Sequence, residues 1–465
     1  MEIQFTAFEY HADENFHKAD YRYQGSPENG WDIFRNEKLI ESLGPGYVLV
    51  KSLYCGICST DIARAKLPFP LPQITGHEVI ATYHDKTVAI EINASHLARG
   101  IEKHNCFYCQ ENMGEHCPDR LTLGIDRLPG GFSPYLLVPQ NAICPLPDSF
   151  DPKLASVIEP FAAALHAVES MSINSGMRIA VVGPRRLGLL LLLALKLYRN
   201  TSNINFTIIA VTRHAELADN CIEFGADEVL LVNEIENKQF DLVYDTTGSV
   251  SGFQLSMEIS NDIVHVKSTH GLSVFGFEKM TQFVIDELSL SVLHENNLDK
   301  LSFSLQGKCH ILLDENISQS IILWLRDNFA DICLTICDFE NIPDAELKLK
   351  LPKDGFEKFD AVLLTSLVQL NRSIGFVRSK GEIFWCDNSS RQNGLWQSFF
   401  DKKLTVCSSR CGSFVKAIML IDDNSALFSE KIKTYISGVF EIESLNEAFE
   451  QAKINPKNIK LIMAH

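Results

Sequence analysis

The sequence predicts an α/β protein in which a mostly β segment precedes a doubly wound parallel sheet, and a second, degenerate copy of the sheet pattern follows. Three observations support this fold class. Short apolar runs punctuated by glycine and proline fill residues 47–145, for example YVLVKSLY, TVAIEI and YLLVP, as is typical of short β-strands. From Met177 onward, strand-like runs alternate with helical ones, which indicates parallel strands joined by helices. After residue 305 the same alternation starts again.

The size and charge of the chain narrow its class. A length of 465 residues predicts about two or three domains, and a net charge of -17 argues against nucleic acid or an anionic membrane surface as a partner. We expect no signal peptide, because the N-terminus has neither a basic start nor an apolar core. We expect no membrane span, because the longest apolar stretch, 187–197, is too short for a bilayer. The 13 cysteines are an odd number, which favours reduced thiols, some of them metal ligands, in a cytoplasmic protein.

The first parallel-sheet segment begins with the strand RIAVV, which meets a turn at Gly183 and Pro184. The helical run RRLGLLLLLALKLY follows. Further strand-like runs are NFTIIAVT, EVLLV, FDLVYDT and IVHVKST, and further helical runs are ELADNCIEFGA and FQLSMEI. This order of elements is typical of a Rossmann-type sheet. The C-terminal segment, 440–465, predicts a strand, a helix and a strand.

The second parallel-sheet segment has the same order of elements. Its strand-like runs are KCHILLD, DICLTICDF, FDAVLLTS and EIFWCDNS, and its helical runs are SQSIILWLRDNF and LVQLNRSIGFV. The spacing also matches, since Lys267 follows Phe240 by 27 residues and Cys386 follows Phe359 by 27. We interpret this as an internal duplication of a Rossmann-type unit. The alternative is one long sheet whose halves share no ancestry.

Two motifs carry candidate metal ligands, CGICSTD at 55–61 and GHE at 76–78. A catalytic zinc takes about three protein ligands of thiolate, imidazole or carboxylate type and keeps one position open. Cys58 and His77 supply two, and Glu159, in IEPFAAALHA, can supply the third. Singly, each has a structural explanation: a small buried residue, a turn, and the start of a helix. Together and in this order they indicate a metal site.

Three further side chains lie beside these candidates in the sequence. Thr60 carries a hydroxyl that can accept the proton of a zinc-bound alcohol. Asp61 can orient the histidine or its loop through hydrogen bonds, and Glu78 can act as an alternating ligand or as a carboxylate behind the ligands. We therefore expect Thr60, Asp61 and Glu78 to take part in catalysis.

These motifs resemble those of the medium-chain dehydrogenase/reductase superfamily, of the zinc-dependent alcohol dehydrogenase type. The residues that carry the resemblance are GIC-x-T-D, GHE, EPFAAALHA, the EIN…CFYC…HCPDR-x-x-LGI run and KST. The resemblance covers nearly the whole chain except the inserted second sheet segment. It implies that Cys58, His77 and Glu159 bind the catalytic zinc and that Cys55 does not.

The resemblance also implies a domain organisation. Residues 1–176, completed by 412–465, correspond to a GroES-like, mostly β catalytic domain. Residues 177–296 correspond to the Rossmann nucleotide-binding domain, and 297–411 to a degenerate second Rossmann-like unit, whose repeat pattern runs over 305–411. One departure follows GHE, where the family has glycines and VIATYHDKTVAI has none. We expect that loop to be tightened or rebuilt.

A possible structural zinc site is formed by Cys106, Cys109 and Cys117. The family's structural zinc lobe uses four cysteines, and the position of the first is Lys103 here. Either His104 or His96 could replace the missing ligand, because imidazole suits zinc. The alternative is a lobe that holds three reduced thiols and no metal.

The expected phosphate-binding turn is GPRRLG, which begins at Gly183. The fingerprint of dinucleotide sites is G-x-G-x-x-G, and Arg185 stands at its middle glycine. That glycine normally lets the backbone approach the pyrophosphate, whereas an arginine blocks close approach but offers charge to phosphate. The candidate cofactor-binding residues of this turn are Gly183, Arg185, Leu187 and Gly188.

Residues after other strands complete the expected cofactor site. Where NAD sites usually place an acid to bind the ribose, the sequence has Thr212 and Arg213, which favours NADP(H) over NAD(H); the alternative is an exposed basic turn. Thr247 directly follows the strand-like run FDLVYDT. The fifth strand ends with Lys267, Ser268 and Thr269. These residues either contact the nicotinamide or the substrate, or they are ordinary polar residues at the end of a strand.

The second sheet segment has acidic residues, Asp314 and Glu315, and no glycine at the corresponding turn. We expect it to bind no dinucleotide, and to form an intramolecular pseudo-dimer that leaves the protein monomeric.

The predicted function is that of a zinc-dependent oxidoreductase. It transfers hydride between NAD(P)(H) and a small alcohol or carbonyl substrate. The rival prediction is a non-catalytic pseudoenzyme or binding protein on a dehydrogenase scaffold, favoured by the lost fingerprint glycine and the altered lobe. Reduction of an activated alkene is a further alternative, against which the complete set of zinc ligands counts.

Overall fold

The computed structural model describes residues 1–268, 273–295, 297–298, 301, 309–329, 331–352, 358–386, 394–454 and 459–465. These residues form two compact units, one of Met1–Ala163 with Cys411–His465 and the other of Ala164–Arg410. The division between the units falls inside helix α5 (Ile158–Glu169), earlier in the chain than the boundary at residue 176 that the resemblance implied. Among the described helices, none has the length and apolar character needed to cross a membrane.

The first unit contains three β-sheets. An N-terminal antiparallel sheet follows sequence order and consists of β1 (Glu2–Tyr10), β2 (Phe16–Ser26), β3 (Gly30–Arg35) and β4 (Lys38–Leu43). The central sheet has the order β12-β7-β6-β5-β25-β24, with β11 also paired to β5. Its strands are β5 (Tyr47–Gly56), β6 (Glu78–Tyr83), β7 (Lys86–Ile90), β11 (Tyr135–Pro139), β12 (Ile143–Pro145), β24 (Ile436–Glu441) and β25 (Lys460–Ala464). A small sheet joins β8 (Asn93–Ala94), β9 (Leu121–Leu123) and β10 (Arg127–Leu128).

The helices of the first unit are short except near the C-terminus. They are α1 (Ser59–Ile62), α2 (His96–Arg99), α3 (Phe107–Gln110), α4 (Pro152–Ala155), α15 (Phe414–Asp423), α16 (Ser425–Tyr435) and α17 (Leu445–Ile454). The predicted mostly β segment and the predicted C-terminal strand, helix and strand are therefore confirmed.

The C-terminal strand completes the first unit. Strand β25 runs antiparallel to β5, with Ile462 opposite Gly56, so the end of the chain lies beside the CGICSTD motif. The loop expected to be tightened is a two-residue turn between β6 and β7. His84 and Asp85 occupy it with φ of 48° and 60°, the left-handed region that such a hairpin turn requires.

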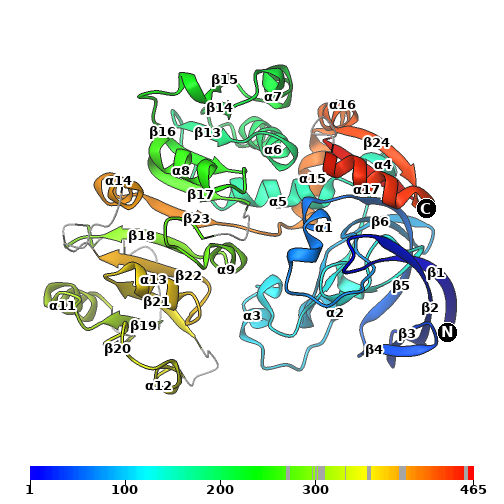
Figure 1. Ribbon diagram of the computed structural model, residues 1–465, viewed down its shortest axis with the longest axis horizontal. Helices are drawn as coiled ribbons and strands as arrows, with labels where there is room; N and C mark the ends of the chain where they lie inside the picture. Colours follow the sequence, from blue (N-terminus) through cyan, green and yellow to red (C-terminus); the bar gives the residue numbers. More distant parts are fainter. Residues whose placement is uncertain are drawn as a thin grey trace. The chain divides into compact units, whose positions relative to one another are not determined.

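The second unit is built on one 11-stranded sheet with the order β15-β14-β13-β16-β17-β23-β18-β22-β21-β19-β20 (Figure 1). Its strands are β13 (Arg178–Val182), β14 (Thr207–Thr212), β15 (Glu228–Leu231), β16 (Phe240–Asp245), β17 (Ser260–Val266), β18 (Ser289–Leu293), β19 (Cys309–Asp314), β20 (Ile332–Cys337), β21 (Phe359–Leu364), β22 (Val377–Cys386) and β23 (Thr405–Ser408). Its helices are α6 (Arg186–Ser202), α7 (Ala218–Phe224), α8 (Val250–Ile259), α9 (Met280–Ile285), α11 (Gln319–Asn328), α12 (Asp344–Leu349), α13 (Leu367–Ser373) and α14 (Gly394–Lys402).

Two strands at the centre of this sheet exchange places relative to the chain order. Strand β18 precedes the second half in sequence, yet it pairs in parallel with β22 of that half. Strand β23 lies at the end of the second half in sequence, yet it pairs in parallel with β17 of the first half. The two strands pair with each other antiparallel, and the orange β23 lies between the green β17 and β18 (Figure 1). The expected boundary at residues 296 and 297 therefore does not separate two sheets, and the duplication itself is not confirmed.

Candidate metal and cofactor sites

The first candidate metal site lies where two segments of the first unit meet. Ligand atoms of Cys58, His77 and Glu78 all lie within 4.8 Å of one another. Cys58 immediately precedes α1, and His77 immediately precedes β6. Gly76 has a φ of 91°, and a Cβ there would lie 2.8 Å from the Cys55 sulfur. A glycine is required because no side chain fits between Cys55 and this turn.

Asp61 ties the two ligand-bearing segments together. Its carboxylate accepts hydrogen bonds from the main-chain N–H groups of Cys58, at 2.8 Å, and Gly76, at 3.1 Å. It also lies 3.6 Å from Nδ1 of His77. Burial opposes protonation of His77, but the neighbouring Asp61 and Cys58 hold the pKa of its imidazole well above the usual value. The expected orienting role of Asp61 agrees with this geometry.

Two more side chains approach the Cys58 sulfur. The Thr60 hydroxyl lies 3.7 Å from it, so the candidate proton acceptor is next to a candidate ligand. The buried ammonium of Lys460, on β25, forms an ion pair with Glu78 and donates a hydrogen bond of 3.1 Å to the Ile57 carbonyl. Burial opposes its charge, but Glu78 and Cys58 raise the pKa of Lys460.

Lys460 was missed from the sequence, although one lysine in the apolar strand KLIMA is a signal of a buried partner. A Cβ at Gly56 would overlap both Glu78 and Lys460, so this glycine leaves room for the ion pair. Glu159, the expected third ligand, lies in α5 and is half-buried. It is not in the cluster with Cys58 and His77, but its charge acts on Lys460. The described structure thus places Glu78, rather than Glu159, next to the other two ligands.

The second candidate metal site gathers a histidine and three cysteines. Ligand atoms of His96, Cys106, Cys109 and Cys117 lie within 4.8 Å of one another. Nδ1 of His96 is 3.4 Å from the Cys117 sulfur and 3.6 Å from the Cys109 sulfur. Nε2 of His96 lies 3.7 Å from the Asp119 carboxylate. A carboxylate behind an imidazole whose other nitrogen faces thiols is a common arrangement around zinc.

The structure distinguishes His96 from His104 as the candidate for the fourth ligand. The ring of His104 stacks on that of His96 with centroids 4.9 Å apart, and its Nδ1 accepts a hydrogen bond from the Cys106 N–H. Only His96 joins the cluster of cysteines. Burial raises the pKa of Cys117 to about 12, so this thiol stays protonated near neutral pH unless a metal ion replaces the proton.

The expected phosphate-binding turn lies at the carboxyl ends of β13 and β16. Gly183 has a φ of 78°, and a Cβ there would lie 2.6 Å from the Thr247 side chain. The Thr247 hydroxyl donates to Asp245 at 2.7 Å, which holds Thr247 against the turn. A Cβ at Gly188 would lie 2.8 Å from the Gly183 carbonyl oxygen, so helix α6 packs closely on the turn. Arg185 is exposed and Leu187 is half-buried.

The remaining candidate cofactor residues fall into two groups. Thr212 ends β14, and its hydroxyl oxygen accepts from the His214 N–H at 3.0 Å, while Arg213 is exposed. The buried ammonium of Lys267 donates to the Ser409 carbonyl at 2.9 Å and to the Arg410 carbonyl at 2.7 Å, contacts that favour the structural explanation for this lysine. Ser268 is half-buried, and Thr269 lies outside the described residues.

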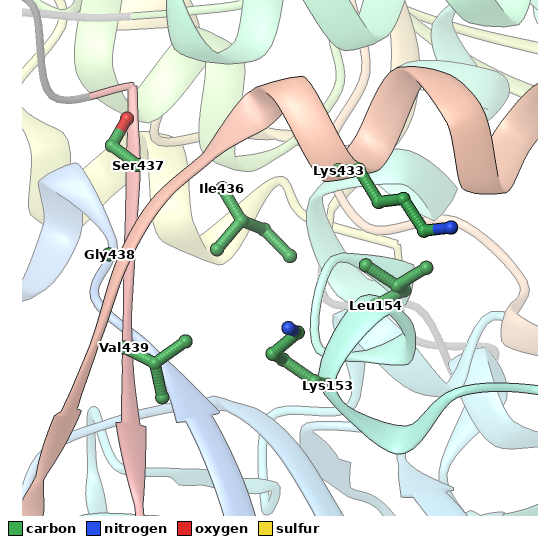
Figure 2. A pocket seen from close by; sticks show the side chains of 7 residues that line it. All are labelled: Lys153, Leu154, Lys433, Ile436, Ser437, Gly438 and Val439. Atoms are coloured by element: carbon green, nitrogen blue, oxygen red, sulfur yellow. The ribbon is translucent and has the colours of Figure 1, made fainter.

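A cavity of about 150 Å³ lies elsewhere in the first unit. It is lined by Lys153, Leu154, Lys433, Ile436, Ser437, Gly438 and Val439 (Figure 2). The apolar side chains of Leu154, Ile436 and Val439 face its centre (Figure 2). None of its lining residues belongs to either metal cluster, so this cavity is not the candidate active site.

Comparison with known proteins agrees with this arrangement. Residues 44–148 match the alcohol dehydrogenase GroES-like domain. An L-threonine 3-dehydrogenase from Mesorhizobium japonicum is 30% identical over 169 residues, which cover 34% of this chain and 48% of the relative. The chain thus spans about half the length of that curated relative.

Two solved structures share the fold over almost the whole chain. L-idonate 5-dehydrogenase from Escherichia coli aligns with a TM-score of 0.58 at 14% identity, covering 100% of this chain and 99% of that one. A cobalt- and zinc-bound thermostable alcohol dehydrogenase from Pyrobaculum aerophilum aligns with a TM-score of 0.55 at 14% identity, covering 100% of both chains. The expected combination of a GroES-like domain with a Rossmann-like parallel sheet is confirmed.

Proposed function

We propose that this chain, whose residues 44–148 match the alcohol dehydrogenase GroES-like domain and whose fold is that of the medium-chain dehydrogenases, is a zinc-dependent oxidoreductase. It transfers hydride between a nicotinamide cofactor and a small alcohol or carbonyl substrate. The observation that carries this proposal is the buried cluster of Cys58, His77 and Glu78. A non-catalytic binding role is not favoured, because a thiol, an imidazole and a carboxylate gathered in this way are the donor set of a catalytic zinc.

The donor atoms of this cluster fit zinc. Nδ1 of His77 lies 3.6 Å from the Asp61 carboxylate, and a carboxylate behind one ring nitrogen leaves the other, Nε2, for a metal. Cys58 and His77 would hold the ion, with Glu159 as the third ligand by resemblance and Glu78 as the alternating one. When bound, zinc supplies the Lewis acidity that lowers the pKa of an alcohol.

The neighbouring side chains have separate tasks in this proposal. Thr60, beside the Cys58 sulfur, accepts the proton that leaves the alcohol oxygen. Asp61 keeps the two ligand-bearing segments in register through its bonds to Cys58 and Gly76. Lys460 offsets the negative charge of Glu78, a carboxylate that lies beside Cys58 and His77.

We further propose that the lobe of His96, Cys106, Cys109 and Cys117 holds a structural zinc. Its four donors match the number and type of a closed tetrahedral site. His96→Ala should remove one equivalent of zinc and leave the catalytic one. His104→Ala is the matched control and should retain both. Equal zinc contents in the two variants would contradict the assignment of His96.

The finer proposals concern cofactor, partners and location. NADP(H) is favoured over NAD(H), because exposed Arg213 can bind a 2′-phosphate. We propose a monomer whose two half-sheets pair within one chain, without nucleic-acid or membrane partners. With thiols that remain free among the described residues, we propose a cytoplasmic location.

The proposed function is tested by metal analysis and by titration of the purified protein with NADPH and NADH. Cys58→Ala and His77→Ala should each lose the catalytic zinc and reduce activity by about a thousandfold or more, while circular dichroism shows an intact fold. Cys55→Ala is the matched control, since Cys55 is buried beside Gly76 but lies outside the cluster. A protein with neither zinc nor nucleotide affinity would refute the enzyme proposal.

A further inference from the structure

Three neighbouring strands of the second unit carry Tyr244, His265 and Cys407 in one row. Tyr244 on β16 is the register partner of His265 on β17, and His265 is the partner of Cys407 on β23. Register partners on parallel strands point to the same face of the sheet. The Tyr244 hydroxyl donates to the Ala167 carbonyl at 3.1 Å, so the end of α5 that belongs to the second unit covers this face.

His265 is a buried side chain with unmet hydrogen-bonding capacity. Its exposure is 0%, and neither ring nitrogen has a hydrogen-bond partner among the other described residues. One face of the ring contacts the Tyr244 ring, with centroids 5.1 Å apart. A buried polar group without a partner costs about 1–3 kcal/mol. Such a group therefore calls for an occupant that its neighbours can also bind.

The neighbours of His265 on this face are soft sulfur atoms. The Cys407 sulfur lies 3.8 Å from the Met171 sulfur, and Met171 follows the end of α5. Burial raises the pKa of Cys407 to about 12, so this thiol is protonated and unreactive unless a metal ion takes the place of its proton. This face of the sheet thus carries an imidazole with two unpartnered nitrogens, a thiol on the neighbouring strand and a thioether beside that thiol.

We propose that His265, Cys407 and Met171 bind a soft monovalent cation, Cu(I). Thiolate and thioether ligands select Cu(I) among the metals that proteins use, and imidazole suits copper as well. The Cu(I) ion displaces the thiol proton, which leaves to solvent, so no electron is transferred and the charge of the buried site does not change. This site lies outside the proposed reaction and shares no residue with either zinc cluster.

The charge of the surroundings excludes zinc at this position. The buried ammonium of Lys267 lies two residues beyond His265 and is the largest charge acting on it, while the Glu287 carboxylate acts in the opposite direction and more weakly. A divalent ion bound to a single thiolate would leave an extra positive charge beside that ammonium in a medium of low dielectric constant. Thioether sulfur is also a poor zinc ligand. A monovalent ion avoids both costs.

The test is an anaerobic titration of the zinc-loaded protein with Cu(I) held by bicinchoninate, a coloured competitor. We expect the Cys407→Ser variant to bind one equivalent of Cu(I) less than the native chain. The Met171→Leu variant should still bind that equivalent, but at least about tenfold more weakly, which corresponds to about 1.4 kcal/mol. Cys221→Ser is the matched control, because Cys221 is fully buried on α7 and its pKa is also raised to about 12. Cu(I) that displaces zinc elsewhere does so equally in all four proteins.

Three measurements distinguish Cu(I) binding from a purely structural role of His265. X-ray absorption of the difference equivalent should show one nitrogen and two sulfur neighbours. Equal stoichiometry in the native chain, Cys407→Ser and Cys221→Ser would overturn the proposal. Ordered water on both nitrogens of His265 in crystals of the copper-loaded protein would overturn it as well.

Discussion

The two halves of the 11-stranded sheet share a hydrogen bond at their first turn but differ in the chemistry of that turn. In the first half, Gly183 follows β13 and donates its N–H to the Val211 carbonyl of β14 at 3.0 Å. In the second half, Glu315 follows β19 and donates to the Cys337 carbonyl of β20 at the same distance. This hydrogen bond is therefore common to the two turns, although only Gly183, and not Glu315, has a positive φ. The first half has a glycine there, which leaves space for a phosphate, and the second has a carboxylate, which repels one.

Side chains of the second half also fill the region beyond its turn. Buried Asp314 accepts hydrogen bonds from the Asn316 N–H at 3.0 Å and from the Gln369 amide at 2.8 Å. At the start of α11, the hydroxyls of Ser318 and Ser320 both bind the Glu295 carboxylate. An internal carboxylate thus lies where a helix N-terminus would attract a phosphate. A parallel sheet with helices on it therefore needs a suitable turn as well before it can bind a nucleotide.

The largest effect on cofactor affinity is expected from a substitution that disrupts the turn of the first half. Gly183→Val should weaken NADPH binding by roughly 100-fold, since a β-branched residue at φ of 78° costs about 1–3 kcal/mol and also meets Thr247. Isothermal titration calorimetry measures the affinity, and circular dichroism checks the fold. Glu315→Val, at the equivalent residue, should leave the affinity unchanged. Equal losses in both variants would mean that the halves do not differ in function.

A smaller effect tests the cofactor preference. Arg213→Ala should weaken NADPH binding about tenfold, because it removes a charge-assisted hydrogen bond to the 2′-phosphate, and should leave NADH binding unchanged. The matched control is Arg326→Ala, which removes an equally exposed arginine from α11 of the second half. Parallel losses for NADPH and NADH would contradict the role of Arg213.

The pH dependence of stability should distinguish the halves as well. Burial lowers the pKa of His265 to about 3, whereas the unfolded chain takes up this proton near pH 6.5. Protonation therefore favours the unfolded state as the pH falls below 6.5. The loss is about 1.4 kcal/mol between pH 7.5 and pH 5.5. The equivalent residue of the second half, counted from the start of β21, is buried Phe384.

His265→Phe gives the first half the residue of the second and should abolish this part of the pH dependence. Urea denaturation at pH 7.5 and pH 5.5, with a copper chelator present, measures it. The native chain and the variant should differ in their pH dependence by about 1.4 kcal/mol. An identical pH dependence would show that His265 is hydrated or protonated in the folded protein.

The smallest expected effect concerns Glu295. Glu295→Gln removes the charge beside α11, yet Asp314 and Glu315 keep the second turn negative. We expect no change in the number of nucleotides bound per chain, as measured by equilibrium dialysis. A second nucleotide per chain in this variant would show that Glu295 alone blocks the site.

The local elements and part of the metal sites were predictable from the sequence. Apolar periodicity located the strands and helices, because burial of one face is a local signal. The donors Cys58, His77, Cys106, Cys109 and Cys117 were identifiable because metal-binding residue types recur at characteristic spacings. The ion pair between Lys460 and Glu78 was not predictable, because 382 residues separate the two in the chain and no local sequence pattern indicates that they meet.

Local residue patterns specify which segments form strands and helices and which residue types are available to bind metal and cofactor. The packing of distant segments specifies that β18 and β23 exchange places, that His96 rather than His104 meets the three cysteines, and that Lys460 meets Glu78. The physical reason is that periodicity acts between residues a few positions apart. Strand order and ligand clusters depend instead on contacts between distant segments, which form only when those segments pack together.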